Sequence, residues 1–254
     1  NEGVVIDDSP REYFTLEDLQ SRKQLFWPPQ KNISFWLVIC CCCCIYGTII
    51  PFISISNEVI RVAYYGIKFE KHQQAVEFVV ARLQGILFLL AAILAPIIGI
   101  TIDYIGYRPA FIVLSSMLLF ISHLLMMFAI GSPLLPILFV GTAYSLFSAV
   151  IWPIIPMLVD DSLQGIAFGL MTSFQNLAES AVPALVSYIL MTNELSLYHS
   201  THDTSKIPST TMMIGISQCE FLFVILSLLG VITGSILWFF DEFPQNNSPR
   251  GVLR

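Results

Sequence analysis

Charge is the property that this sequence has least of. Charged side chains make up 12% of its 254 residues and apolar ones 56%, whereas soluble proteins usually carry about 25% charged residues. The charges are also unevenly placed, since twenty-four of the thirty lie in residues 1–31, 57–82, 193–210 and 241–254. This scarcity excludes a soluble globule and predicts a polytopic helical membrane protein.

Basic stripes and dispersed cysteines are lacking as well. The net charge is −6, which argues against nucleic-acid binding. Five of the six cysteines are consecutive, from Cys40 to Cys44, and successive side chains on a helix point about 100° apart. They cannot converge on one metal ion, so no metal or other cofactor is indicated. We interpret the run as small apolar residues of a lipid-embedded helix, with palmitoylation as the alternative.

Long apolar runs, in contrast, are abundant. A transmembrane helix needs about 20 mostly apolar residues, and six stretches reach this length: 32–56, 80–102, 109–131, 133–158, 164–192 and 211–240. We therefore expect an all-α bundle of six transmembrane helices over residues 32–240.

Two charged segments flank this bundle, residues 1–31 and the tail 241–254. Because six crossings return the chain to its starting face, both segments lie on one side. That side receives seven Lys and Arg residues against five on the other, which favours the cytoplasm under the positive-inside rule. The charged linker at the start predicts that the chain is a piece of a longer polytopic protein.

The turn between the second and third spans holds the most specific motif, Gly99-Ile-Thr-Ile-Asp103-Tyr-Ile-Gly106-Tyr-Arg108. Gly106 suits a tight turn, and Gly99 would let a neighbouring helix approach closely. Asp103 would be stabilised near the positive N-terminal end of another helix.

Partners for these charges follow the fourth span. Asp160 and Asp161 are expected on the same membrane face as Arg108, and the next helix begins just beyond them. We expect Arg108 to pair with one of these carboxylates and Asp103 to lie against that helix start. The alternative is that all four charges anchor the membrane interface without touching.

A polar face runs along the fifth span. Thr172, Gln175, Asn176 and Glu179 occur at i, i+3, i+4 and i+7, which is one side of a helix. An ionisable side chain near the bilayer centre costs about 2.5–3.5 kcal/mol on insertion scales. Glu179 is therefore expected to carry protons or to recognise a substrate amine, whereas Thr172 fits ordinary interhelical packing.

Other spans add further polar or aromatic positions. Tyr144, Ser148 and Trp152 share one face of the fourth span, and Tyr46 lies at the middle of the first. We expect Tyr46, Tyr144, Trp152, Gln175, Asn176 and Glu179 to line a substrate cavity. Glu220 is interpreted as a packing or topology residue near an interface. His123, the lone histidine of the third span, is interpreted as a structural histidine whose hydrogen bonds are satisfied.

The pattern Gly-x3-Asp-x2-Gly-x-Arg between the second and third spans resembles the signature loop of the major facilitator superfamily, although Pro109 departs from the usual basic residue. Members are twelve-helix transporters built from two six-helix halves. The resemblance implies the C-terminal half of such a fold, with the N-terminal half of the same transporter as partner. Gly99, Asp103, Gly106, Arg108, Asp160 and Asp161 would form a conformational latch.

A second set of residues resembles the lysosomal dipeptide transporters within that superfamily. It comprises Gly141 to Leu146, Trp152-Pro153, Gly165 to Gly169 and Gln175 to Leu177. The resemblance implies a secondary active or facilitative transporter of dipeptides or other small amino-acid-like solutes. It also implies a lysosomal or endosomal membrane, with the plasma membrane as the alternative, and a glycosylated accessory membrane protein.

Other functions remain open from the sequence. The chain would equally suit a carrier of a sugar, organic anion or drug, or a membrane scaffold or sensor that does not transport. An intramembrane enzyme is disfavoured because the spans show no paired aspartates, no Ser–His dyad and no His–Glu metal cluster. Membrane lipid and a small-molecule substrate are the expected partners, and nucleic acid is not.

Overall fold

The computed structural model describes residues 33–65, 73–201 and 209–242. These residues form six long helices and contain no strand: α2 (Ile33–Ile60), α3 (Gln73–Ile105), α4 (Arg108–Met127), α5 (Leu134–Ile151), α7 (Gln164–Thr201) and α8 (Ser209–Glu242). A π-helix, η2 (Arg61–Tyr65), continues α2, while α6 (Ile155–Leu158) and the 3-10 turn η4 (Asp161–Leu163) connect α5 to α7. The all-α fold predicted from the apolar runs is confirmed.

Five of the six long helices are long and apolar enough to cross a membrane, and these are α2 with η2, α3, α4, α5 and α8. Their most apolar windows have mean hydropathies of 2.0 to 2.6. The exception is α7, because the polar face at Thr172, Gln175, Asn176 and Glu179 interrupts its apolar stretch. Its role as a sixth span stays a prediction.

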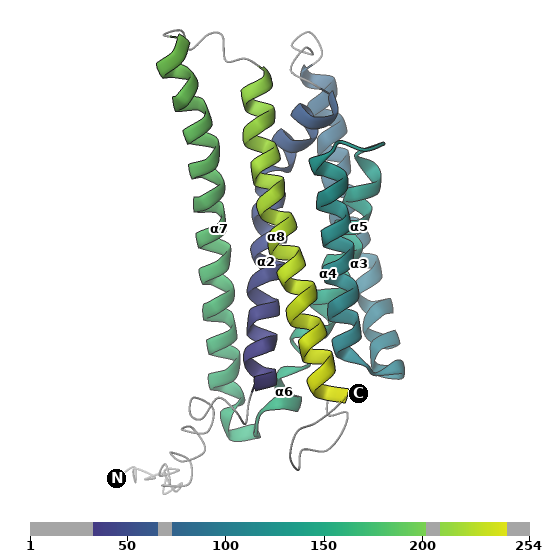
Figure 1. Ribbon diagram of the computed structural model, residues 1–254. Helices are drawn as coiled ribbons and strands as arrows, with labels where there is room; N and C mark the ends of the chain where they lie inside the picture. The colour runs from purple at the N-terminus through teal and green to yellow at the C-terminus, as the bar shows by residue number, and fades with distance from the viewer. Residues whose placement is uncertain (1–32, 66–72, 202–208, 243–254) are drawn as a thin grey trace, which may run out of the picture.

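The long helices run alternately up and down and form a bundle in which α2 and α8 are central (Figure 1). On one side α2 and α8 pack against α7, and on the other α8 packs against α4. The remaining close pairs are α3 with α5 and α4 with α5. This arrangement leaves α7 at one edge of the bundle and α3 at the other.

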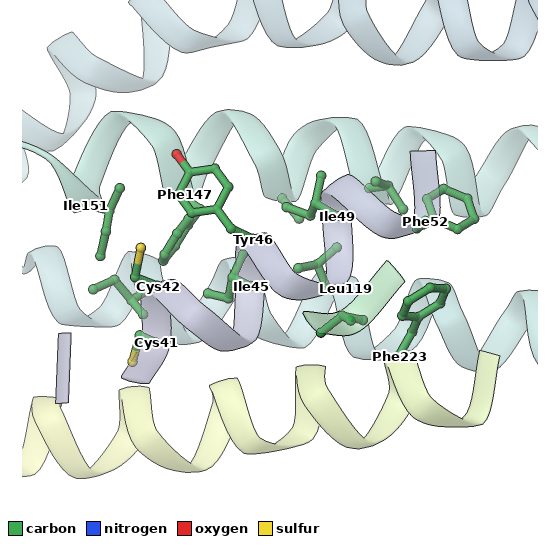
Figure 2. Close-up of a cluster of buried hydrophobic side chains, with 14 of the residues drawn as sticks. Cys41, Cys42, Ile45, Tyr46, Ile49, Phe52, Leu119, Phe147, Ile151 and Phe223 are labelled. Carbon is green, nitrogen blue, oxygen red and sulfur yellow. The ribbon is translucent and has the colours of Figure 1, made fainter. Parts of the chain in front are cut away.

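The core lies where α2 meets α4, α5 and α8. Phe35, Phe52, Phe147 and Phe223 are among its largest fully buried side chains, and Figure 2 shows the last three gathered around α2. Two of the consecutive cysteines, Cys41 and Cys42, are also fully buried here. These two face the protein core rather than lipid, which refines the interpretation of the cysteine run.

The fourth predicted span, 133–158, is wrong as a single helix. Helix α5 ends at Ile151, a turn follows through Ile154, and α6 is a separate short segment. Pro153 is the physical reason, because proline has no backbone N–H to continue the helical hydrogen bonds. The break places Trp152 at a turn rather than inside a span.

Two tight turns use left-handed backbone conformations. At the α3–α4 turn Gly106 has φ 73° and Tyr107 has φ 56°, so the predicted need for glycine at Gly106 is confirmed. At the α4–α5 turn Gly131 has φ 73° and Ala129 has φ 49°. This second turn makes α4 end at Met127, before the predicted limit of residue 131.

Candidate functional site

Three of the predicted cavity residues meet beside the middle of α2. Tyr46 is 5% exposed, and its ring centroid lies 6.5 Å from that of Tyr144 and 5.4 Å from that of Phe147. The Tyr46 hydroxyl also interacts with the side chain of Trp152. Figure 2 shows Tyr46 reaching from α2 toward Phe147. The structure thus joins α2, α5 and the turn after α5 in one aromatic group.

The same group extends to α7 through Trp152. Its indole stacks on Phe168 with a centroid separation of 6.4 Å and an interplanar angle of 19°. Six residues farther along α7, Phe174 makes an edge contact with Trp36 of α2, with centroids 6.2 Å apart. Aromatic contacts therefore hold α7 against α2 and against the turn after α5.

Glu179 lies on the part of α7 that passes Tyr46. A Cβ built on Gly47 would lie 3.4 Å from both Ala178 Cβ and Val182 Cγ2, so the two helices are close at this level. Glu179 therefore lies near the Tyr46 side chain. The assignment of both residues to one substrate cavity stays a prediction.

Gln175 and Glu179 form a pair of half-buried polar side chains. Gln175 Nε2 donates a hydrogen bond to Glu179 Oε1 at 2.8 Å. Gln175 Oε1 is buried and has no hydrogen-bond partner within the described part of the chain. Asn176, in contrast, is exposed, so the structure does not bring it into this group.

The predicted latch residues lie differently from expectation. Arg108 Nη2 donates to Asp103 Oδ1 at 2.8 Å, with side-chain exposures of 13% and 72%. No ion pair among the described residues joins Arg108 to Asp160 or Asp161. The expected partner was wrong for this conformation because the tight turn at Gly106 already brings Asp103 within reach of Arg108.

The two remaining aspartates have other surroundings. Asp161 Oδ1 accepts a hydrogen bond from Gln164 Nε2 at 2.8 Å, at the start of α7. Asp160 is exposed and precedes η4 without capping it through its side chain. The expected close approach at Gly99 is also wrong, because a Cβ there would meet nothing within 4 Å. The α3–α4 turn and the connection from α5 to α7 still lie at the same end of the bundle, the end that carries α6 (Figure 1).

Comparison with known proteins gives one consistent family of relatives. No protein-family model matches the chain. It is 26% identical over 161 residues to the lysosomal dipeptide transporter MFSD1 of Gallus gallus, an alignment that covers 63% of this chain and 34% of the relative. The identity to the same transporter of Homo sapiens is 24% over 159 residues, with 63% and 32% covered. The chain thus matches about a third of the length of these relatives.

The helices match one half of a major facilitator transporter. This protein is accordingly an integral, multi-pass membrane protein, as the five apolar helices also indicate. These relatives are named as transporters, with dipeptide as their substrate and the lysosome as their location.

One buried pair in this half escaped the sequence analysis. His123 of α4 and Glu220 of α8 are both 0% exposed, and His123 Nδ1 lies 2.8 Å from Glu220 Oε2. The contact agrees with the expected roles of His123 as a structural histidine and of Glu220 as a packing residue, although neither was expected to be the partner of the other. The expected position of Glu220 near a membrane interface stays a prediction. The spans do contain a His–Glu pair, although no group of three or more metal-binding side chains occurs among the described residues.

Aromatic rings enclose the His123–Glu220 pair. The His123 ring centroid is 5.1 Å from those of Phe52 and Phe223, which belong to α2 and α8. Neither His123 Nε2 nor Glu220 Oε1 has a hydrogen-bond partner in the described part of the protein. Spacing offered no signal for this contact, because the two residues are 97 positions apart. Only the scarcity of intramembrane ionisable residues marked both as positions that need a partner.

Proposed function

We propose that this chain is half of a secondary active or facilitative transporter that carries dipeptides or other small amino-acid-like solutes across a lysosomal membrane. The single observation that carries this proposal is the position of the Gln175–Glu179 pair of α7 beside the aromatic side chains of Tyr46 and Tyr144. Transporter sites of this type lie near the bilayer midplane, between bundles that rock against each other. The similarity to lysosomal dipeptide transporters supports the substrate class and the location.

The exposed faces of α3 and α7 support a second bundle as partner. Ile93, Ile97 and Ile100 of α3 and Leu177 and Leu185 of α7 are large apolar side chains that are at least half exposed. Such surfaces mark contacts with lipid or with another protein. We propose that the N-terminal half of the same transporter covers part of both faces and that membrane lipid covers the rest.

Uptake into proteoliposomes tests the function directly. With the full-length protein reconstituted, an inward gradient of a labelled dipeptide is expected to produce uptake that saturates and that unlabelled dipeptides inhibit. Protein-free liposomes are the control. Uptake of sugars, organic anions or drugs in place of any dipeptide in a broad panel would contradict the substrate class, and absence of all uptake would favour a scaffold or sensor.

The Asp103–Arg108 pair is proposed as part of a latch that stabilises one conformation of the transporter. Arg108→Asp places two carboxylates in contact and is expected to lower uptake, whereas Arg108→Asp combined with Asp103→Arg restores the pair and recovers it. The measurement is initial dipeptide uptake for both variants at equal protein levels.

A matched combination separates the observed partner from the predicted one. Arg108→Asp combined with Asp160→Arg or with Asp161→Arg is expected to recover no uptake, because neither aspartate contacts Arg108. Recovery with either of these, and none with Asp103→Arg, would show that the functional latch uses the end of the fourth span.

A further inference from the structure

We propose that Glu179, with Gln175 and the rings of Tyr46 and Trp152, binds the protonated amine of the transported solute. The inference rests on the transport function proposed above and names the chemical group that the site selects. Glu179 is an unusual residue for a helix that is expected to cross the membrane. Acidic side chains are rare inside such helices, and those that occur face a cavity or a partner.

Hydrogen-bonding capacity at this site is unbalanced toward acceptors. Glu179 Oε1 accepts from Gln175 Nε2, while Gln175 Oε1 is buried without a partner. Glu179 Oε2 takes part in no hydrogen bond or ion pair among the described residues. A primary ammonium carries three donors and no acceptor, so it complements two free acceptor oxygens and one carboxylate charge.

The described part of the protein contains no cation that could fill this place. Its three arginines are engaged elsewhere, Arg61 with Glu58, Arg82 over the ring of Phe78 and Arg108 with Asp103. A cation that pairs with the ionised form of Glu179 must then come from outside the described residues. A solute amine supplies it, and an anionic solute that lacks an amine would be repelled.

Aromatic faces beside Glu179 favour the same ligand. Tyr46 lies near Trp152 and near Glu179, where α2 and α7 approach closely at Gly47. The ring of Tyr144 lies edge-on to that of Tyr46, with centroids 6.5 Å apart. Tyrosine and tryptophan rings attract cations through their negative faces, and this attraction strengthens when water is excluded. We therefore expect the Glu179 carboxylate, the Gln175 amide oxygen and the aromatic rings to bind the same ammonium group of the solute.

The test compares a dipeptide carrying a free amine with its N-acetylated counterpart in the proteoliposome assay. For the wild-type protein, the KM of the free dipeptide is expected to be lower than that of the N-acetylated dipeptide by about tenfold or more. The acetyl group removes the charged hydrogen bond between the amine and the protein. Glu179→Gln keeps the shape of the side chain and removes the charge. The ratio of the two KM values, which measures the preference for the free amine, is therefore expected to fall to about one, while uptake of the N-acetylated dipeptide is retained.

Ser180→Ala is the matched control, since this exposed neighbour bonds only its own helix at Asn176 O. It is expected to keep the wild-type preference.

Equal uptake of the two dipeptides by the wild type would overturn amine recognition while leaving transport intact. A preference that persists in Glu179→Gln would overturn the role of Glu179, and uptake of neither dipeptide by the wild type would overturn the proposed transport itself. Should Glu179→Gln fail to fold, Gln175→Leu, which removes the second acceptor, is expected to lower the preference.

Discussion

Glu220→Leu is expected to lower the free energy of unfolding by about 3–5 kcal/mol, because it leaves His123 buried without the one hydrogen-bond partner that it has among the described residues. The two side chains are fully buried and 2.8 Å apart. A polar group stranded in an apolar interior retains its desolvation cost and loses the contact that offset it. The measurement is unfolding of the full-length protein in detergent micelles, followed by circular dichroism.

The double variant His123→Leu with Glu220→Leu separates pairing from simple packing. It removes both polar groups and is expected to be more stable than Glu220→Leu alone, since buried pairs are often replaced by apolar residues at little cost. Ser235→Ala is the control on α8, because Ser235 is exposed and bonds only Val231 O of its own helix. Destabilisation equal to the sum of the two single variants would show that the pair contributes no coupling.

Gly141→Val is expected to destabilise the bundle by about 1–3 kcal/mol through overpacking between α3 and α5. A Cβ at Gly141 would lie 3.2 Å from the backbone oxygen of Leu87 and 3.3 Å from Leu90 Cδ2. The backbone of α3 cannot move aside as a flexible side chain can, so α3 and α5 must separate to make room for the valine. Small residues allow helix backbones to approach closely at contacts within membranes. Unfolding of the full-length protein in detergent measures the change in the free energy of unfolding.

Gly85→Val is the matched control for this steric argument. Gly85 lies on α3, and a Cβ there would meet nothing within 4 Å. The control is expected to be neutral or slightly stabilising, because glycine is a poor helix former. Equal destabilisation by both variants would mean that helix propensity, rather than the approach of α5 to α3, sets the outcome.

The candidate site was predictable as far as single helices determine it. The period of 3.6 residues placed Gln175 and Glu179 on one face of α7, and the structure joins them by a hydrogen bond. The midpoints of the apolar runs placed Tyr46 and Glu179 at similar depth, and α2 and α7 approach closely at this level. Asn176 belongs to the same face by spacing, yet it is exposed, because the direction of a neighbouring helix decides which edge of a face is covered.

At the α3–α4 turn, too, the local backbone conformation was predictable and the side-chain contact was not. Gly106 was expected to permit a tight turn and has φ 73°, since backbone conformation there depends on local sterics. The partner of Arg108 was expected in Asp160 or Asp161 and proves to be Asp103. The choice between carboxylates at one end of a bundle depends on where α5 stops, and Pro153 stops it earlier than its hydropathy indicates.

The sequence by itself determined that this is an α-helical membrane protein, where most of its long helices lie, and that its few intramembrane ionisable groups need partners. Only the tertiary structure decided which partners they have. His123 meets Glu220 from 97 positions away, inside rings of Phe52 and Phe223. Scarcity of charge follows from the low dielectric of the bilayer and is visible in composition, whereas contacts between helices follow from packing, which no single helix encodes.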